Sequence, residues 1–265
     1  YRIAVDSAPL LERALGREAS LGFIGKNTML IRPGLGSFFL MAEVLWNVPY
    51  DLELKPFQRY VGCRSCSQCL TGCPTGAFVA PFKLESSRCI AYLTIERRGP
   101  LSEVERESIG EWLFGCDICQ EVCPFNFTRL KTGGQSSLAK LGPQAGVSSI
   151  VDLTQVLSIR NDQEFLRFAQ GTPLTRPKRE GILRNAACVA SATTATSCVK
   201  VLQEAVREDA SEVVRSTSLW ALARLSSRAG VPNARCLQEL CERLRADGSP
   251  LVSREATLVL ERGLR

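Results

Sequence analysis

Eight cysteines between residues 63 and 123 have the spacing of ligands for two [4Fe–4S] clusters. The first run is Cys63-x2-Cys66-x2-Cys69-x3-Cys73-Pro74, the spacing in which three thiolates hold one cluster and the fourth crosses to the other. The second run, Cys116-x2-Cys119-x3-Cys123-Pro124, lacks its first cysteine. Cys89 lies between the two runs and is the candidate to replace the missing ligand.

The crossing rule divides these cysteines into two sets of four. It predicts that cluster one is held by Cys63, Cys66, Cys69 and Cys123, and that cluster two is held by Cys73, Cys89, Cys116 and Cys119. Zinc sites and disulfides are the competing interpretations. A fused four-cysteine run that ends in Cys-Pro is unusual for zinc, and disulfides would require an oxidising compartment, for which the sequence gives no indication.

The chain contains no histidine. This excludes from its 265 residues a histidine-ligated haem, a Rieske centre, an HExxH zinc site and a Ser-His-Asp triad. Proton transfer would therefore have to use Asp, Glu, Lys, Tyr or Cys, and a bound corrinoid could not receive an axial imidazole from these residues.

The elements that would position the cysteines fall into sections along the chain. Before the cysteines, we predict a strand at Ile3–Val5, a helix from Pro9 to Glu18, a Gly-rich turn over residues 21–28 and a buried strand from Phe38 to Trp46. Short helices and loops carry the cysteines, and the polar residues 131–137 read as a linker.

From about residue 173 the apolar residues recur only at helical spacing. We predict five helices, at Arg179–Ala192, Ser197–Glu208, Glu212–Ser226, Ala234–Arg245 and Val252–Arg262. A loose internal repeat near the length of HEAT-type helix pairs favours a short solenoid, with a plain helical bundle as the alternative. We expect Cys188, Cys198, Cys236 and Cys241 to be small core residues on these helices rather than ligands, and Trp220 to pack in the core.

Positive charge is concentrated in the second half of the chain. Residues 1–130 hold 14 Lys and Arg against 14 Asp and Glu, whereas residues 131–265 hold 19 against 13. The excess is compatible with an ordinary solvated surface or with attraction to a polyanion such as RNA.

Several segments together resemble the epoxyqueuosine reductase family, in the same order and over nearly the whole chain. The segments are Val5-Asp-Ser-Ala-Pro-Leu-Leu-Glu-Arg13, Gly22-Phe-Ile-Gly-Lys-Asn-Thr28, Arg88-Cys-Ile-Ala-Tyr-Leu-Thr-Ile-Glu96, Gly115-Cys-Asp-Ile-Cys-Gln120, Val122-Cys-Pro-Phe-Asn126 and Leu183-Arg-Asn-Ala186. The resemblance implies a cobalamin-dependent enzyme with two [4Fe–4S] clusters that reduces epoxyqueuosine to queuosine in the tRNA anticodon.

The fold class that we expect is α+β, in four parts. Residues 1–60 would form part of an α/β cobalamin-binding region, residues 61–130 a ferredoxin-like module with two clusters, residues 131–172 a connecting segment, and residues 173–265 an all-α HEAT-like repeat domain. The family normally has a further N-terminal stretch that helps to form the cobalamin pocket.

The resemblance also assigns residues. Asp6 matches the family's proton donor and would lie at the cobalamin, although an N-cap before Pro9 is the simpler interpretation of this residue. Gly25 would allow a close backbone approach to the corrin, with further contacts from Lys26, Asn27, Thr28 and Asp117. Clustered cations suit phosphate, so the candidates for tRNA contact are Arg97, Arg98, Arg176, Lys178, Arg179 and Arg184.

The same resemblance implies the partners. They are the anticodon stem-loop of a queuosine-pathway tRNA and a low-potential electron donor, and we expect a cytoplasmic monomer without a membrane segment. A cobalamin-dependent reductive dehalogenase and a simple ferredoxin-type electron carrier remain as alternatives. A dehalogenase with a small halogenated substrate does not need the basic helical tail. An electron carrier does not need the more than 130 residues that follow the cysteines.

Overall fold

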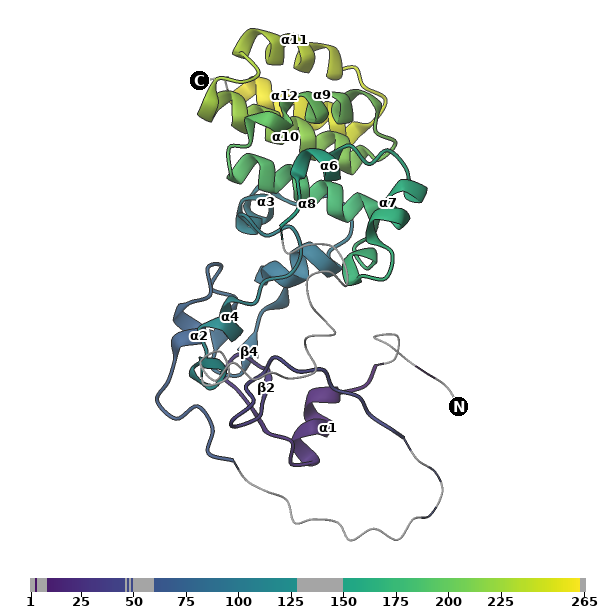
Figure 1. Cartoon of the computed structure of the whole chain (residues 1–265). Helices are drawn as coiled ribbons and strands as arrows, with labels where there is room; N and C mark the ends of the chain where they lie inside the picture. The colour runs from purple at the N-terminus through teal and green to yellow at the C-terminus, as the bar shows by residue number, and fades with distance from the viewer. Residues whose placement is uncertain are drawn as a thin grey trace. The chain divides into compact units, whose positions relative to one another are not determined.

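The computed structural model describes residues 9–45, 60–127 and 150–262, together with Ile3, Asn47 and Pro49. Contacts divide the chain into two compact units (Figure 1). Unit one comprises Tyr1–Ser86 and Asp117–Ser136, and unit two comprises Ser87–Cys116 and Ser137–Arg265. The segment from Ser87 to Cys116 therefore belongs with the helices of unit two, whereas the sequence interpretation placed it in the ferredoxin-like module.

Unit one is built from short elements around a small core. Its described helices include α1 (Glu12–Glu18), α2 (Gln68–Thr71) and α4 (Ile118–Glu121), and residues 124–127 are also helical. Its described strands are β1 (Phe23–Ile24), β2 (Leu30–Ile31), β3 (Phe78–Ala80) and β4 (Lys83–Leu84). The strands form two antiparallel pairs, with Phe23 opposite Ile31 in β1–β2 and Phe78 opposite Leu84 in β3–β4. The rings of Phe23 and Phe125 meet edge to face at 5.1 Å between centroids.

The helix predicted from Pro9 is confirmed as α1, which begins three residues later, at Glu12. The buried strand predicted from Phe38 is wrong over the described residues 38–45, where the chain forms no strand and Leu40, Val44 and Leu45 are 93%, 81% and 76% exposed. A strand requires a second strand to pair with, and the strand pairs among the described residues are β1–β2 and β3–β4. The strand predicted at Ile3–Val5 and the linker at residues 131–137 lie outside the described residues.

Unit two is helical in the part of it that the structure describes. It contains η1 (Ser86–Arg88, shared with unit one at the boundary), the π-helix η2 (Tyr92–Glu96), α3 (Glu103–Ile109), α6 (Leu153–Leu157), α7 (Asp162–Ala169), η5 (Pro173–Thr175), α8 (Lys178–Ala192), η6 (Thr196–Cys198), α9 (Val199–Glu208), α10 (Glu212–Ala229), α11 (Ala234–Leu244) and α12 (Pro250–Arg262). All five helices predicted after residue 173 are confirmed, with ends that differ by at most three residues.

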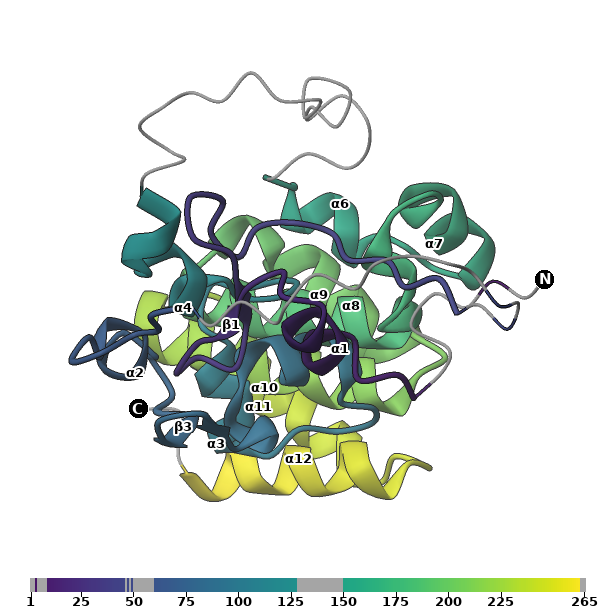
Figure 2. The same ribbon diagram turned by 90° about the horizontal axis from the view of Figure 1, so that it is seen from below.

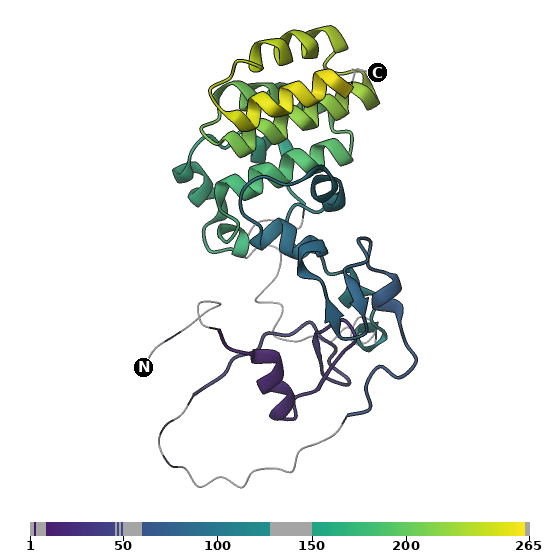
Figure 3. The same ribbon diagram turned by 180° about the vertical axis from the view of Figure 1, so that it is seen from behind.

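Helix α10 forms the centre of unit two. It contacts α8, α9 and α12, and α11 packs on α12 (Figure 3). Its residues Leu219, Leu222 and Leu225 are fully buried, and Trp220 is 3% exposed in the same core, as predicted. Helices α3 and α12, both labelled in Figure 2, are joined by an ion pair at 2.9 Å between the buried side chains of Arg106 and Glu255. Among the four cysteines expected in the core, Cys188, Cys198 and Cys241 are buried, but Cys236 is exposed because it lies on the outer face of α11.

Two helices lie within the segment that we expected to be a connection. In α6, the Asp152 carboxylate accepts a hydrogen bond from the amide of Thr154, and in α7 the Asn161 side chain accepts one from the amide of Glu164. Asn161 and Glu164 also stand in the spacing of a capping box. These caps were visible in the sequence, but the helices are only 5 and 8 residues long and give a weak periodic signal.

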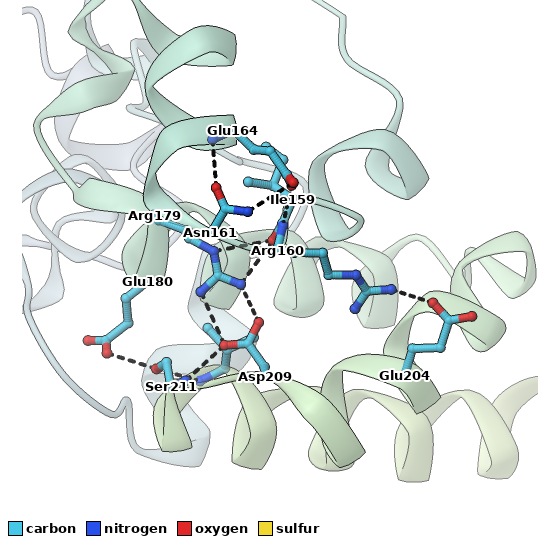
Figure 4. Close-up of polar contacts among 10 residues, drawn as sticks. Ile159, Arg160, Asn161, Glu164, Arg179, Glu180, Glu204, Asp209 and Ser211 are labelled. Carbon is cyan, nitrogen blue, oxygen red and sulfur yellow. Dashed lines mark hydrogen bonds and ion pairs between the residues drawn. The ribbon is translucent and has the colours of Figure 1, made fainter.

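An arginine–aspartate contact occurs twice along the helices. The Arg179 guanidinium, on α8, pairs with Asp209, whose carboxylate also accepts from the amide of Ser211 (Figure 4). Arg215, on α10, pairs in the same way with Asp247, which accepts from the amide of Ser249. Each serine hydroxyl then accepts from the amide three residues later, at the start of the next helix. The repetition fixes successive helices by the same polar contact and agrees with a repeat.

Removal of Asp209 is expected to destabilise unit two strongly. The side chains of Arg179 and Asp209 are 7% and 2% exposed, so Asp209→Ala leaves a buried guanidinium without its counter-charge. We expect a loss of about 3–5 kcal/mol in the free energy of unfolding, measured by urea denaturation. Glu204→Ala is the matched control, because it removes the exposed partner of Arg160 (Figure 4) and should cost about 1 kcal/mol or less. Equal losses in the two variants would contradict this account.

Candidate metal centre

The four cysteines predicted to hold cluster one lie around a single pocket of unit one. The pocket has a volume of about 370 Å³. Its lining includes all four thiols, together with Asn27, Ile31 and Phe125. The helix α2 carries Cys69, whereas Cys123 comes from the segment after α4, 54 residues farther along the chain. The structure thus brings together the set given by the crossing rule, including its most distant member.

The thiols of this set affect one another electrostatically. Burial raises the pKa of Cys69, and the nearby charges of Cys63, Cys123 and Cys66 raise it further. Burial also raises the pKa of Cys123, with Cys63 and Cys66 acting in the same direction. Four thiolates gathered in a partly buried pocket repel one another, so the site favours a bound cation that compensates their charge.

The arrangement suits a cluster better than a single ion. A zinc ion draws its four ligands to about 2.3 Å from one point. Among the described residues, no three His, Cys, Asp or Glu side chains lie close enough to share one metal ion. In a cubane each iron takes its own cysteine, so the thiols surround a volume instead of a point. The pocket and its donor set therefore fit a [4Fe–4S] cluster.

The turn before β2 supports the cluster-one loop. The backbone amide of Lys26 donates to the Sγ of Cys63 at 3.4 Å, which is the kind of contact that stabilises a cluster sulfur. The Nζ of Lys26 donates to the carbonyls of Arg64 and Cys66 at 2.8 and 2.7 Å. The amide nitrogen of Asn27 donates to the carbonyl of Cys119 at 3.0 Å, and its Oδ1 accepts from the amide of Met29.

These contacts bear on the residues predicted at cobalamin. Asn27 is 3% exposed, and both polar atoms of its side chain are bonded within unit one. Lys26 is bonded to two loop carbonyls. A Cβ at Gly25 would lie 2.5 Å from Ile31, so this glycine is needed for packing against β2. The described side chains at this turn hold the cluster loop and do not form a corrin site of their own.

The other three residues predicted at cobalamin do not take part in the hydrogen bonds to the cysteine loops described above. Thr28 has a positive φ of 65°, and its carbonyl accepts from Arg13 at 2.7 Å. Asp117 is exposed, and its Oδ1 accepts from the side chain of Gln120 at 2.6 Å. Asp6 lies outside the described residues.

Sequence reasoning missed the role of Asn126. Its Oδ1 accepts from the amide of Ser37 at 2.7 Å, while its Nδ2 donates to the carbonyl of Gln120 at 2.7 Å. A Cβ at Gly36 would lie 1.9 Å from the same Oδ1. Asn126 is 2% exposed and ties the segment after Cys123 to the β2 turn. The signal in the sequence was an asparagine three residues after Cys123, a predicted ligand.

The ligands predicted for cluster two are divided between the units. Cys73 and Cys119 belong to unit one, whereas Cys89 and Cys116 belong to unit two. Within unit one, burial acts to raise the pKa of Cys73, but hydrogen bonds from Thr75 and from the amide of Ala77, at 3.3 Å from Sγ, lower it overall. A thiol with a lowered pKa is suited to bind metal as a thiolate. The grouping of these four cysteines around one cluster stays a prediction.

Two of the predicted tRNA-binding arginines are structural instead. Arg179 is 6% exposed and is held by Asp209 and by the carbonyl of Ile159. Arg184 is 1% exposed, and its guanidinium donates to the carbonyls of Leu93, Arg97 and Gly99 at 2.8–2.9 Å. Neither can reach a phosphate, so these two predictions are wrong. Their charge alone gave no sign that both arginines, which α8 carries, are buried inside unit two.

The other four cations lie at the surface of unit two. Arg98 donates to the carbonyl of Arg176 at 2.6 Å, which places the two residues together. Arg176 pairs with Glu96 at 2.8 Å, and the half-buried Arg97 pairs with Glu105 at 3.5 Å. Lys178 is exposed at the start of α8. We call these four residues, Arg97, Arg98, Arg176 and Lys178, the basic group.

Comparison with known proteins relates both the cysteines and the whole chain to one family. Residues 62–126 match the family described as a 4Fe-4S double cluster binding domain. An epoxyqueuosine reductase of Xanthomonas campestris is 39% identical over 224 residues, which are 84% of this chain and 61% of that protein. That of Pseudomonas aeruginosa is also 39% identical, over 84% of this chain and 60% of its own length. The chain belongs to the epoxyqueuosine reductase family.

Solved structures of epoxyqueuosine reductases agree with this assignment. One, bound to an epoxyqueuosine-modified tRNA-Tyr stem loop, superposes with a TM-score of 0.78 at 28% identity and covers 97% of this chain and 64% of that one. Another, from Bacillus subtilis, has a TM-score of 0.76 at 29% identity, covers 94% and 63%, and has an aspartate-bearing catalytic loop swung out of the active site. The chain spans about three fifths of the length of the epoxyqueuosine reductases that it matches.

Proposed function

We propose that this chain takes part in the reduction of epoxyqueuosine to queuosine in a tRNA anticodon, as an oxidoreductase. The observation that carries the proposal is the gathering of Cys63, Cys66, Cys69 and Cys123 around one pocket, in a chain whose homologues are epoxyqueuosine reductases. Conversion of an epoxide to an alkene consumes two electrons and two protons and releases water. The protein must therefore deliver electrons one at a time and supply protons to the departing oxygen.

We propose that two [4Fe–4S] clusters carry the electrons from a low-potential donor. Cluster one would be held by the four cysteines of the pocket, with the Lys26 amide donating toward the Cys63 sulfur. Cluster two would be held by Cys73, Cys89, Cys116 and Cys119. Hydrogen bonds to sulfur and solvent exposure set cluster potentials over a wide range, so the two sites are expected to differ in potential.

Cobalamin is proposed on the family resemblance alone. When bound, it would supply a nucleophilic cobalt centre for the epoxide carbon. The side chains of Lys26 and Asn27 already donate hydrogen bonds to carbonyls of the cysteine loops. The remaining candidates for direct contact with cobalamin are Thr28, Asp117 and Asp6. The described residues do not form a complete corrin site.

We propose tRNA as the substrate carrier, bound in part by the basic group. The helices would form a HEAT-like array, which the repeated Arg–Asp–Ser contacts support. None of the helices in the described residues combines the length and the apolar character needed to cross a membrane. We propose that the protein works in the cytoplasm as a monomer.

Removal of two exposed cations is expected to weaken tRNA binding. Arg98→Ala with Lys178→Ala deletes the cations of the basic group that carry no carboxylate ion pair among the contacts described. Each lost phosphate contact should reduce the slope of log K against log salt by about one. Titration of a fluorescent anticodon stem-loop at several salt concentrations measures this slope. Arg235→Ala is the control, since Arg235 is an exposed cation on α11, outside the basic group. Equal slopes in all three proteins would contradict the assignment.

The function itself is tested by anaerobic assay with epoxyqueuosine-containing tRNA, cobalamin and a low-potential reductant. Formation of queuosine, detected by mass spectrometry of the nucleosides, is the expected result. A protein that reconstitutes with iron and transfers electrons but leaves the epoxide intact would be an electron carrier instead.

A further inference from the structure

A buried hydroxyl in unit two joins the two segments that carry cysteine ligands there. Thr94, in the π-helix η2, is fully buried. Its Oγ1 donates to the carbonyl of Ile90 at 2.7 Å and accepts from the amide of Gly115 at 2.9 Å. Ile90 directly follows Cys89, and Gly115 directly precedes Cys116. One hydroxyl thus bridges the neighbours of both cysteines.

Asn185 joins the same two segments from helix α8. Its Nδ2 donates to the carbonyl of Thr94 at 2.8 Å and to the carbonyl of Leu113 at 3.1 Å. The side chain is fully buried. Both amide protons are used on backbone acceptors, so the distance between the η2 segment and the Leu113–Cys116 segment is fixed from a rigid, well-packed helix.

Arg184 completes the contact. Its Nη2 and Nε donate to the Oδ1 of Asn185 at 2.9 and 3.2 Å, which orients that amide. The same guanidinium donates to the carbonyls of Leu93, Arg97 and Gly99. Burial lowers the pKa of Arg184. Burial of a guanidinium against neutral acceptors is costly, and here it fixes the backbone on both sides of Thr94.

We propose that Thr94, Arg184 and Asn185 form a clamp that sets the separation of Cys89 and Cys116, and thereby the assembly and the reduction potential of cluster two. The inference rests on the proposed two-cluster function. The three side chains are positioning residues, because they act through the backbone next to the ligands. A π-helical turn at this point agrees with the proposal, since such turns are frequent at functional sites.

The test compares Thr94→Val with Thr94→Ser after anaerobic reconstitution of the full chain. Valine keeps the shape of threonine but removes both hydrogen bonds, whereas serine keeps them. The readouts are iron per chain, the electron paramagnetic resonance of each reduced cluster and its midpoint potential. Thr257→Val is the matched control, because Thr257 bonds the carbonyl of Ser253 four residues earlier, as Thr94 bonds Ile90, but lies on α12.

The expected result is a selective loss in Thr94→Val. Iron should fall from roughly eight toward roughly four per chain, or the signal of one cluster should shift in potential, while the other cluster is unchanged. Thr94→Ser and Thr257→Val should match the wild type. Asn185→Asp, which keeps the acceptor for Arg184 and loses the donors, should reproduce the defect.

Two results would overturn the clamp. One is that Thr94→Val and Asn185→Asp keep both clusters at wild-type potentials. The other is that Thr257→Val causes the same loss as Thr94→Val, which would indicate a general effect on folding. If the wild-type protein itself takes up fewer than two clusters, the proposed function fails, and this result is distinguishable because it precedes any comparison of variants.

Discussion

Cys123→Ala is expected to remove cluster one and to leave cluster two in place. Iron in the anaerobically reconstituted protein should fall from roughly eight to roughly four per chain. The reason is that Cys123 lines the cluster-one pocket together with the first three cysteines of the first run, and the charges of Cys63 and Cys66 act to raise its pKa, although Cys123 belongs to the second run in the sequence. Loss of the fourth thiolate leaves one iron without its protein ligand.

The matched experiment is Cys73→Ala, which tests the crossing of ligands between the two runs. If the crossing is correct, this variant loses cluster two, although Cys73 is only four residues from Cys69. Electron paramagnetic resonance distinguishes which cluster remains in each variant. Cys188→Ala is the control, because this cysteine of α8 is buried in the hydrophobic core of unit two, where burial raises its pKa to about 12, and it belongs to neither cysteine run. Loss of the same cluster in Cys73→Ala and Cys123→Ala would contradict the crossing.

Spacing and periodicity predicted the parts of this protein that depend on local sequence. The cysteine runs predicted which four cysteines line one pocket, because short loops with fixed spacing allow few arrangements around a cubane. The five helices after residue 173 were predicted within three residues at each end, since their apolar faces recur at helical spacing and their ends carry caps such as Ser211 and Asn233.

The failures concern tertiary contacts that local sequence does not encode. Arg179 and Arg184 look like phosphate ligands because they are cations in a basic stretch, yet their acceptors are Asp209 and the backbone at residues 93–99. Lys26 and Asn27 look like cofactor donors, yet their acceptors are carbonyls of the cysteine loops, 38 to 92 residues away. A polar side chain is equally able to bind a ligand and a carbonyl, so only the fold distinguishes these uses.

The lack of a tertiary contact also explains why the strand predicted from Phe38 does not form over the described residues. An apolar run of this length is compatible with a buried strand, but burial needs a partner surface. Leu40 and Val44 are among the most exposed apolar residues of the described chain. A contiguous group of exposed apolar residues is typical of a surface that contacts another segment or protein.

Asp6→Asn is expected to abolish most turnover while leaving both clusters and tRNA binding intact. Asparagine keeps the size and one oxygen of aspartate but cannot deliver a proton to the departing epoxide oxygen. General acid catalysis contributes about 10²–10⁴ in rate, so kcat should fall by that factor with little change in the affinity for the stem-loop. The assignment of Asp6 as proton donor rests on the family resemblance of the segment around it.

The control for this variant is Asp162→Asn. Asp162 is exposed in the first turn of α7, outside all the predicted site residues, and asparagine has the same size as aspartate there. A proton donor and a surface carboxylate then give different results: Asp6→Asn lowers kcat with unchanged iron content, and Asp162→Asn changes neither. If Asp6→Asn turns over at the wild-type rate but melts at a lower temperature, Asp6 is an N-cap for the helix after Pro9, and another group must protonate the substrate. These 265 residues include no histidine, so a donor supplied by them would be a different carboxylic acid, a lysine, a tyrosine or a cysteine.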